Sequence, residues 1–316
     1  MSLIRITLTE RIDTLDKRKI ILDTDMGSDI DDSLALTYLL AQPLCELLGV
    51  ITVSGEPEKR ASVADSLIRY FGRRIPVFPG VEQPLLTPQQ QPFCPQAEIL
   101  ARWAHASSFR KNYALEFIRD MSDQFPGEVT LLSIGPATNA ALALASYPEL
   151  AAKLAGVTQM IGYFTNNLGL NFYSEWNCFC DPFAAALVYQ RQLHRHRSVG
   201  LDVTMKTSLP QETVNELFKI PALKPVFDYS RSWFAQKKAN GDNEGMYFHD
   251  AMAAVSLFDE SLFEFIRGEV SVELISGAYL GGTQFEESEE GPHEIAVEVD
   301  LNNFYDHFFG VLGSAM

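Results

Sequence analysis

The sequence is poor in cysteine and in cationic residues, and it has no long apolar run. Its four cysteines among 316 residues show no spacing typical of zinc or redox sites, so a disulfide scaffold is not expected. No stretch approaches the roughly 20 apolar residues that a membrane-spanning helix needs. The N-terminus also lacks the apolar core of a signal peptide. These absences predict a cytoplasmic protein with no membrane partner.

Lys and Arg number 25 against 41 Asp and Glu, which gives a formal net charge of −16. Binding to nucleic acid requires Lys and Arg clustered against the phosphates, so we expect no nucleic-acid partner. A large net charge commonly serves solubility. A metal ion, or a small neutral or cationic ligand, fits this charge better than a polyanion does.

Apolar runs of strand length alternate with helical patterns along most of the chain. The predicted strands cover residues 19–23, 46–53, 75–78, 129–134, 157–163 and 198–204, and the first helices cover residues 33–42 and 57–72. This alternation predicts an α/β fold, Rossmann-like, with a mostly parallel central sheet and helices on both faces. Residues 270–300 read as further strands before a closing helix at 301–313. We expect a single domain over residues 1–316, with a helical insertion at about 205–250.

Polar motifs follow several of these strands. Residues 23–32 follow the first strand, residues 135–139 follow the strand at 129–134, and Asp202 lies near the end of another. Ligands of such sheets bind beyond the carboxyl ends of the strands. We therefore expect the functional site at this edge of the sheet.

Five carboxylates are concentrated in the first of these turns. They belong to Asp23, Asp25, Asp29, Asp31 and Asp32. So much like charge is costly unless something neutralises it, and a hard cation such as Ca²⁺ or Mg²⁺ prefers oxygen ligands. The absence of nearby His or Cys argues against zinc. A solvated acidic turn that caps the next helix is the alternative, but the position between an apolar strand and an apolar helix favours the metal.

Five motifs, in order, resemble those of the inosine-uridine preferring nucleoside hydrolases, a family of calcium-dependent nucleoside N-ribohydrolases. They are Asp23-Thr24-Asp25-Met26-Gly27 with Asp31-Asp32-Ser33, Gly135-Pro136-Ala137-Thr138-Asn139, Glu175-Trp176-Asn177 with Asp181-Pro182, Asp202-Val203-Thr204, and His249-Asp250-Ala251. The resemblance extends along almost the whole chain. It implies the nucleoside hydrolase fold, a Ca²⁺ cofactor, a small nucleoside as substrate, a role in purine or pyrimidine salvage, and assembly into a homodimer or homotetramer.

The resemblance also implies a role for each matching position. Asp25, Asp32, Asp250 and the backbone carbonyl of Ile134 would ligate Ca²⁺. Asp31 would be the base that takes a proton from a bound water. Glu175 and Asn177 would hydrogen-bond the sugar hydroxyls, Met160 would lie against the ribose, and His249 would be the acid for the leaving group.

Three departures from the family pattern affect the site. Three residues separate Gly27 from the Asp pair where the family commonly has one, so Asp29 could take over a role at the metal. Glu56 stands where members often carry an Asn, and we expect it to contact the substrate. The Asn that usually precedes Glu175 by six residues is absent. The candidates for that sugar contact are Asn166, Asn167 and Asn171, and the predicted site includes Asn171.

The predicted reaction is hydrolysis of the N-glycosidic bond of a ribonucleoside to ribose and free base. Cleavage of this bond develops oxocarbenium character on the ribose, as in other glycoside hydrolysis. A metal ion that clamps the sugar and a carboxylate that activates water are suited to it. A metal-dependent phosphohydrolase using Asp23 or Asp25 is one alternative, although no Lys and downstream Asp pair stand in register for it. A non-catalytic nucleoside or calcium sensor is the other.

Overall fold

The apolar runs form one nine-stranded sheet in the computed structural model, which describes residues 17–167, 169, 174–241 and 245–315. The strands are β1 (Arg18–Thr24), β2 (Cys45–Thr52), β3 (Val77–Pro79), β4 (Val129–Ser133), β5 (Gly156–Gln159), β6 (His196–Ser198), β7 (Phe263–Val272), β8 (Thr283–Glu287) and β9 (His293–Val299). Their order is β3-β2-β1-β4-β5-β6-β9-β7-β8. Only the pairs made by β7, with β8 and β9, are antiparallel. The predicted fold class is confirmed.

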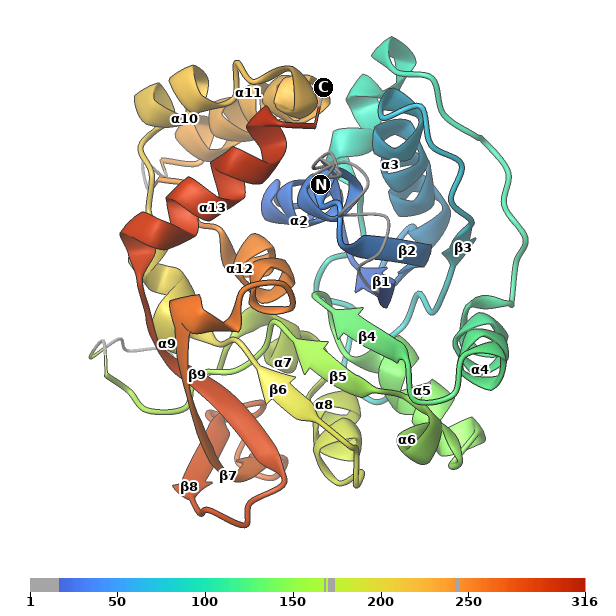
Figure 1. Cartoon of the computed structure of the whole chain (residues 1–316), viewed down its shortest axis with the longest axis vertical. Helices are drawn as coiled ribbons and strands as arrows, with labels where there is room; N and C mark the ends of the chain where they lie inside the picture. The colour runs from blue at the N-terminus through green and yellow to red at the C-terminus, as the bar shows by residue number, and fades with distance from the viewer. Residues whose placement is uncertain (1–16, 168, 170–173, 242–244, 316) are drawn as a thin grey trace, which may run out of the picture.

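Helices cover both faces of this sheet (Figure 1). They are α2 (Asp31–Ala41), α3 (Pro57–Tyr70), α4 (Ala114–Gln124), α5 (Thr138–Ser146), α6 (Leu150–Lys153), α7 (Trp176–Cys180), α8 (Pro182–Tyr189), α9 (Leu201–Thr204), α10 (Gln211–Leu217), α11 (Lys224–Ala239), α12 (His249–Ser256) and α13 (Leu301–Gly313). Short 3₁₀ segments are η1 (Pro95–Arg102), η2 (Met205–Thr207), η3 (Pro221–Leu223) and η4 (Glu260–Leu262).

Successive side chains of β1 point to opposite faces and join separate cores, as the two-residue period of a strand requires. Ile20 and Leu22 belong to the core that packs under α2, α3, α12 and α13. Ile21 belongs to the core under α4, α5 and α8. All three side chains are fully buried, which explains why the run reads as continuously apolar and not as an alternating pattern.

The strand order reverses between β1 and β4. From β1 the chain proceeds to β2 and β3 on one side, and it then returns to place β4, β5 and β6 on the other side. Such a reversal leaves a crevice at the carboxyl ends of the two strands that flank it. The acidic turn after β1 and the segment after β4 therefore meet at this crevice.

Two predicted strands are wrong over most of their length. The strand expected at 157–163 ends at Gln159 with β5. Residues 198–204 were expected to be a strand, but β6 ends at Ser198 and Leu201–Thr204 forms the helical turn α9. The carboxylate of Asp202 accepts hydrogen bonds from the backbone N–H groups of Phe164 (3.0 Å) and Thr165 (2.7 Å). Periodicity cannot separate a short buried strand from a buried helical turn, so these contacts decided the conformation.

The segment 205–250 contains α10 and α11, and α11 packs beside α3. The hydroxyl of Tyr229 lies 2.8 Å from Ser66 Oγ, and Tyr229 is fully buried. That this segment is an insertion within a single domain stays a prediction.

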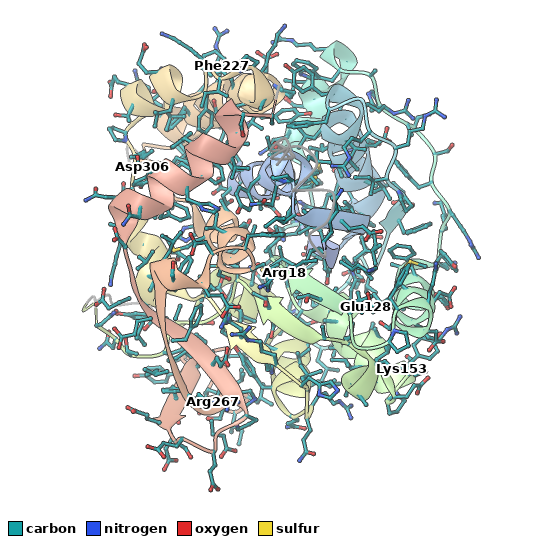
Figure 2. The ribbon with its side chains drawn as sticks, in the orientation of Figure 1. Arg18, Glu128, Lys153, Phe227, Arg267 and Asp306 are labelled. Atoms are coloured by element: carbon teal, nitrogen blue, oxygen red, sulfur yellow. The ribbon has the colours of Figure 1, made fainter. Side chains whose placement is uncertain are left out.

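Charged side chains point outward from the molecule, among them Arg267 on β7 and Asp306 on α13, which Figure 2 labels. Across the described ranges, no helix combines the length and the apolarity that spanning a membrane requires.

Helix α12 is anchored by Phe248, which immediately precedes it. The ring is fully buried and packs edge-on against Phe308 of α13, with 5.4 Å between ring centroids. Because Phe248 precedes His249 and Asp250, this packing also sets where those two side chains begin.

We expect Phe248→Ala to lower the free energy of unfolding by about 3–5 kcal/mol, because it leaves a ring-sized cavity in the core. Urea denaturation of the two proteins measures the change. Ile275→Ala removes an apolar side chain that is 95% exposed and should stay within about 0.5 kcal/mol of wild type. Equal, small effects of both substitutions would refute the anchoring role.

Candidate active site

A cavity of about 590 Å³ lies at the carboxyl ends of β1, β4 and β5. Six carboxylate residues line it: Asp25, Asp29, Asp31, Asp32, Glu175 and Asp250. Most of the predicted site residues are therefore brought together, although they are spread over more than 220 positions of the chain.

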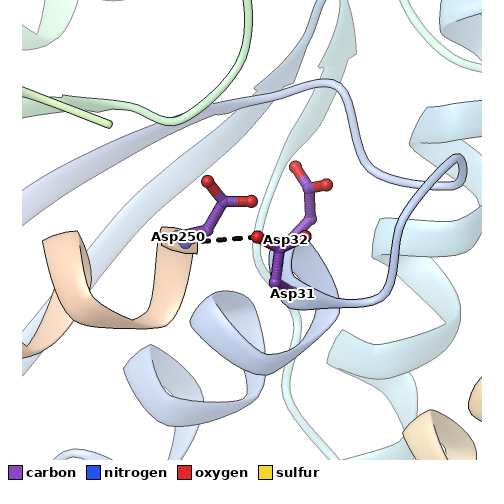
Figure 3. A group of neighbouring side chains, drawn as sticks. All are labelled: Asp31, Asp32 and Asp250. Atoms are coloured by element: carbon purple, nitrogen blue, oxygen red, sulfur yellow. Dashed lines mark hydrogen bonds between the residues drawn. The ribbon is translucent and has the colours of Figure 1, made fainter. Parts of the chain in front are cut away.

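Three of the carboxylates form a compact group at the start of two packed helices. Asp31 and Asp32 occupy the first turn of α2, and Asp250 occupies the first turn of α12. One carboxylate oxygen from each lies within 4.8 Å of the others. The backbone N–H of Asp250 donates to Asp31 Oδ2 at 3.4 Å (Figure 3). Both helix N-termini thus direct partial positive charge toward this group.

Ionising all three carboxylates of this group costs free energy, because they are buried and repel one another. The pKa of each of Asp31, Asp32 and Asp250 is raised well above its ordinary value, chiefly by desolvation and then by neighbouring carboxylates. A divalent cation with a preference for oxygen ligands would offset this repulsion. The donor set therefore fits a hard metal ion, and the carbonyl of Ile134 on the same cavity wall could join it.

Asp25 lies beside this group but does not belong to it. Its side chain, which is 7% exposed, accepts a hydrogen bond at Oδ2 from the amide of Gln91. Desolvation raises the pKa of Asp25, while the positive charge of Arg60 opposes that rise. Asp29, by contrast, is exposed at the cavity rim and accepts from the N–H of Ile30 at 2.6 Å.

Gln91 is a site residue that the sequence analysis missed. It lines the cavity from the loop between β3 and η1, 66 residues beyond Asp25. The loop is conspicuous for Pro and Gln, but nothing local distinguishes Gln91 from its neighbours Gln89 and Gln90. Only the folded chain shows which of them faces a carboxylate.

Glu175 and Asn177 meet the cavity at the start of α7. The Glu175 carboxylate caps this helix by accepting from the backbone N–H groups of Asn177 (2.7 Å) and Cys178 (3.0 Å). It also accepts from the N–H of Gly162, outside the helix, at 3.1 Å. Burial nonetheless raises the pKa of Glu175 to about 7. The Asn177 amide donates to the carbonyls of Ile134 and Met160, both at 3.0 Å. Its Oδ1 is thus the atom left to face a ligand.

His249 and Met160 also line the cavity. The Nδ1 of His249 lies 2.8 Å from Thr204 Oγ1, and the imidazole stacks on Tyr247 with 5.2 Å between ring centroids. Burial, followed by the charge of Lys237, lowers the pKa of His249 to about 4. At neutral pH this imidazole is therefore uncharged.

Two exposed aromatic residues of α7 complete the wall. Trp176 and Phe179 are 50% and 38% exposed and lie 5.9 Å apart between ring centroids. Both line the cavity. Such rings offer flat surfaces on which a heteroaromatic base can stack.

Of the other two predicted substrate contacts, Glu56 does not line the cavity and Asn171 cannot be placed. Among the described residues the lining excludes Glu56, whose carboxylate instead accepts from the Cys94 N–H at 2.9 Å and pairs with Lys59 at 2.5 Å. Asn171 lies outside the described residues. Its alternatives Asn166 and Asn167 are exposed and bond to Tyr163 and to the carbonyl of Asp202, respectively.

The family model and the curated relative that match this sequence both belong to the nucleoside hydrolases. The model of the inosine-uridine preferring nucleoside hydrolase family matches residues 20–306. The non-specific ribonucleoside hydrolase RihC of Salmonella paratyphi B is 32% identical over 310 residues, covering 90% of this chain and 94% of that protein.

Solved structures show the same fold at lower sequence identity. A plant nucleoside hydrolase, PpNRh1, matches with a TM-score of 0.80 and 23% identity, covering 94% of this chain and 99% of that one. A purine-preferring ribonucleoside hydrolase from Gardnerella vaginalis matches with a TM-score of 0.79 and 22% identity over the same shares of the two chains.

Asp32→Asn should raise the melting temperature in the presence of a chelator, by roughly 2–6 °C, because it removes one buried like charge. The Asn Oδ1 can still accept from Thr24, which bonds Asp32 at 2.5 Å. The variant should also lose most of the stabilisation that added Ca²⁺ gives wild type, which is about 2.7 kcal/mol at 100 times the dissociation constant. Calorimetric scans with EDTA and with CaCl₂ measure both effects.

Asp306→Asn is the matched control, since it removes the same charge from an exposed position on α13. It should leave both melting temperatures unchanged. A Ca²⁺-induced shift in Asp32→Asn as large as in wild type would contradict the metal site.

Proposed function

We propose that this chain, which belongs to the inosine-uridine preferring nucleoside hydrolase family, binds Ca²⁺ and uses it to hydrolyse ribonucleosides to ribose and free base. The observation that carries the proposal is the group of Asp31, Asp32 and Asp250, buried in a cavity at the carboxyl edge of the sheet. The same cavity presents Glu175 and Asn177, side chains suited to sugar hydroxyls, and has the volume that small-molecule sites commonly have.

The calcium ion would be held by Asp31, Asp32, Asp250 and the carbonyl of Ile134. Asp29, at the exposed rim of the same cavity, would be a further ligand. When bound, the ion would clamp sugar hydroxyls and orient a water molecule, which is template chemistry. The carboxylates around the sugar favour the positive charge that develops on the ribose as the bond to the base breaks.

The geometry favours exchanging two of the roles that the family resemblance implied. Asp31 shares the compact group with Asp32 and Asp250, where it serves as a ligand. Asp25 lies next to that group, and its carboxylate is held by Gln91. We therefore assign to Asp25 the base that accepts a proton from the attacking water, and to Asp31 a place at the metal.

His249, which lines the same cavity, would assist departure of the nucleobase. As an uncharged imidazole it can donate one N–H hydrogen bond, and acceptance at Nδ1 from the Thr204 hydroxyl would leave Nε2 as the donor. The aromatic rings of Trp176 and Phe179 would contact the nucleobase. Neither feature discriminates between purines and pyrimidines, so we propose that nucleosides of both kinds serve as substrates. The Salmonella relative is named a non-specific ribonucleoside hydrolase.

The decisive experiment follows free ribose from inosine, adenosine, guanosine, uridine and cytidine, with and without EDTA. Asp25→Asn should lower kcat by about 10²–10⁴-fold, the usual contribution of a general base, while calorimetric titration still shows Ca²⁺ binding. Asp31→Ala should lose both activity and Ca²⁺ affinity. Ca²⁺ binding by wild type without ribose release from any nucleoside would reject hydrolysis and favour a sensor.

His249→Ala should lower kcat for inosine by about 10–100-fold, because the base then leaves without a hydrogen-bond donor. It should affect 4-nitrophenyl riboside little, since nitrophenolate departs without such help. Initial rates with the two substrates give the comparison. Equal losses on both would show that His249 acts on the sugar or on the structure and not on the leaving group.

Formation of a homodimer or homotetramer stays a prediction, which light scattering on the purified protein would check. Cytoplasmic location and a salvage role stay predictions too.

A further inference from the structure

Gln91 occupies an unusual place in the cavity wall, between a carboxylate and an indole. Its amide donates from Nε2 to Asp25 Oδ2, and its Oε1 accepts from the indole N–H of Trp176 at 3.2 Å. The side chain is 9% exposed and lines the cavity. No motif of the chain marks this residue.

We propose that Gln91 is a positioning residue for the hydrolytic reaction: its amide holds the Asp25 carboxylate in the orientation that accepts the proton from water. The inference rests on the proposed function, in which Asp25 is the base. It adds a hydrogen-bonded chain, Trp176 to Gln91 to Asp25, that joins the aromatic wall to the reacting carboxylate.

An amide suits this position because it carries a donor at one end and an acceptor at the other. The indole of Trp176 can only donate, so it fixes the carbonyl end of Gln91. The NH₂ end is thereby directed at Asp25, which as a carboxylate can only accept. A Glu at this position would meet Asp25 with like charge, and an apolar residue would leave one Asp25 oxygen without its partner.

The main chain of Gln91 is also tied to the acidic turn, through the fully buried Arg60 of α3. One end of the guanidinium donates to the carbonyls of Gln91 (3.2 Å) and Phe93 (2.9 Å). The other end donates to the carbonyls of Asp25 and Met26. Arg60 therefore links the backbone of Gln91 to the backbone of Asp25, in addition to the hydrogen bond between their side chains.

This arrangement gives a reason for the unusual residue at position 56. Glu56 has a left-handed backbone conformation, with φ of 57°, and its carboxylate binds the Cys94 N–H. It fastens the far end of the loop that carries Gln91. The amide next to the reacting groups is therefore that of Gln91 and not that of a residue at position 56. Glu56, in the turn after β2, holds the Gln91 loop in place instead.

The test compares steady-state kinetics of wild type, Gln91→Met and Gln91→Glu with inosine at saturating Ca²⁺. Loss of positioning should lower kcat by about 10–100-fold in both variants, with KM changed by less than about threefold. Gln90→Met is the matched control, since Gln90 is exposed on the same loop and its amide donates to the nearby Pro88 carbonyl. It should match wild type. Full activity of Gln91→Glu, which conserves size, would reduce Gln91 to a packing role and overturn the inference.

A double-mutant cycle tests the chain of hydrogen bonds. Trp176→Phe retains an aromatic ring but removes the indole N–H. It should lower kcat in the wild-type background and cause little further loss in the Gln91→Met background, because it acts through Gln91. Additive losses would show that Trp176 acts independently.

A crystal structure of Gln91→Met with Ca²⁺ supplies a readout that does not depend on activity. The Asp25 carboxylate should turn from its wild-type orientation once its donor is gone. An unchanged Asp25 overturns the inference even if wild type proves inactive. An active wild type whose kcat is unaffected by Gln91→Met overturns the inference alone and leaves the proposed function standing.

Discussion

The concentration of negative charge in a buried space is the constraint on which the rest of this structure depends. Asp25, Asp31, Asp32 and Asp250 are each less than a tenth exposed, and burial raises the pKa of every one. Carboxylates in such surroundings are costly in the absence of a cation. These carboxylates therefore lower the stability of the ligand-free protein. Functional sites commonly carry such a cost, because binding or catalysis requires the groups that cause it.

The surrounding framework holds these groups in place against their repulsion. Arg60 bonds the carbonyls beneath the acidic turn, and the N-termini of α2 and α12 direct their N–H groups at it. Asn139, in the first turn of α5, donates to Asp23 at 2.8 Å and to the Thr52 carbonyl at 3.1 Å. Several residues of the family motifs thus support the site without lining it.

The parts that sequence reasoning predicted well are those governed by short-range patterns. Buried strands and amphipathic helices leave apolar runs of characteristic length, and the closing helix at 301–313 coincides with α13. The acidic turn was recognisable because five carboxylates fall within ten residues. The strand expected at 198–204 was wrong because the buried carboxylate of Asp202, and not the apolar run around it, organises that segment.

The sequence by itself determined the fold class, the family and the residue types of the site. Each of these can be recognised from local composition or from the order of motifs along the chain. The tertiary structure alone decided which of these residues lie together. It placed Asp31 with Asp32 and Asp250, turned Glu56 away, and brought Gln91 to Asp25 across 66 residues. The reason is physical: a hydrogen bond or a ligand cluster depends on distances of a few ångströms, and chain separation carries no information about such distances until the sheet has been assembled.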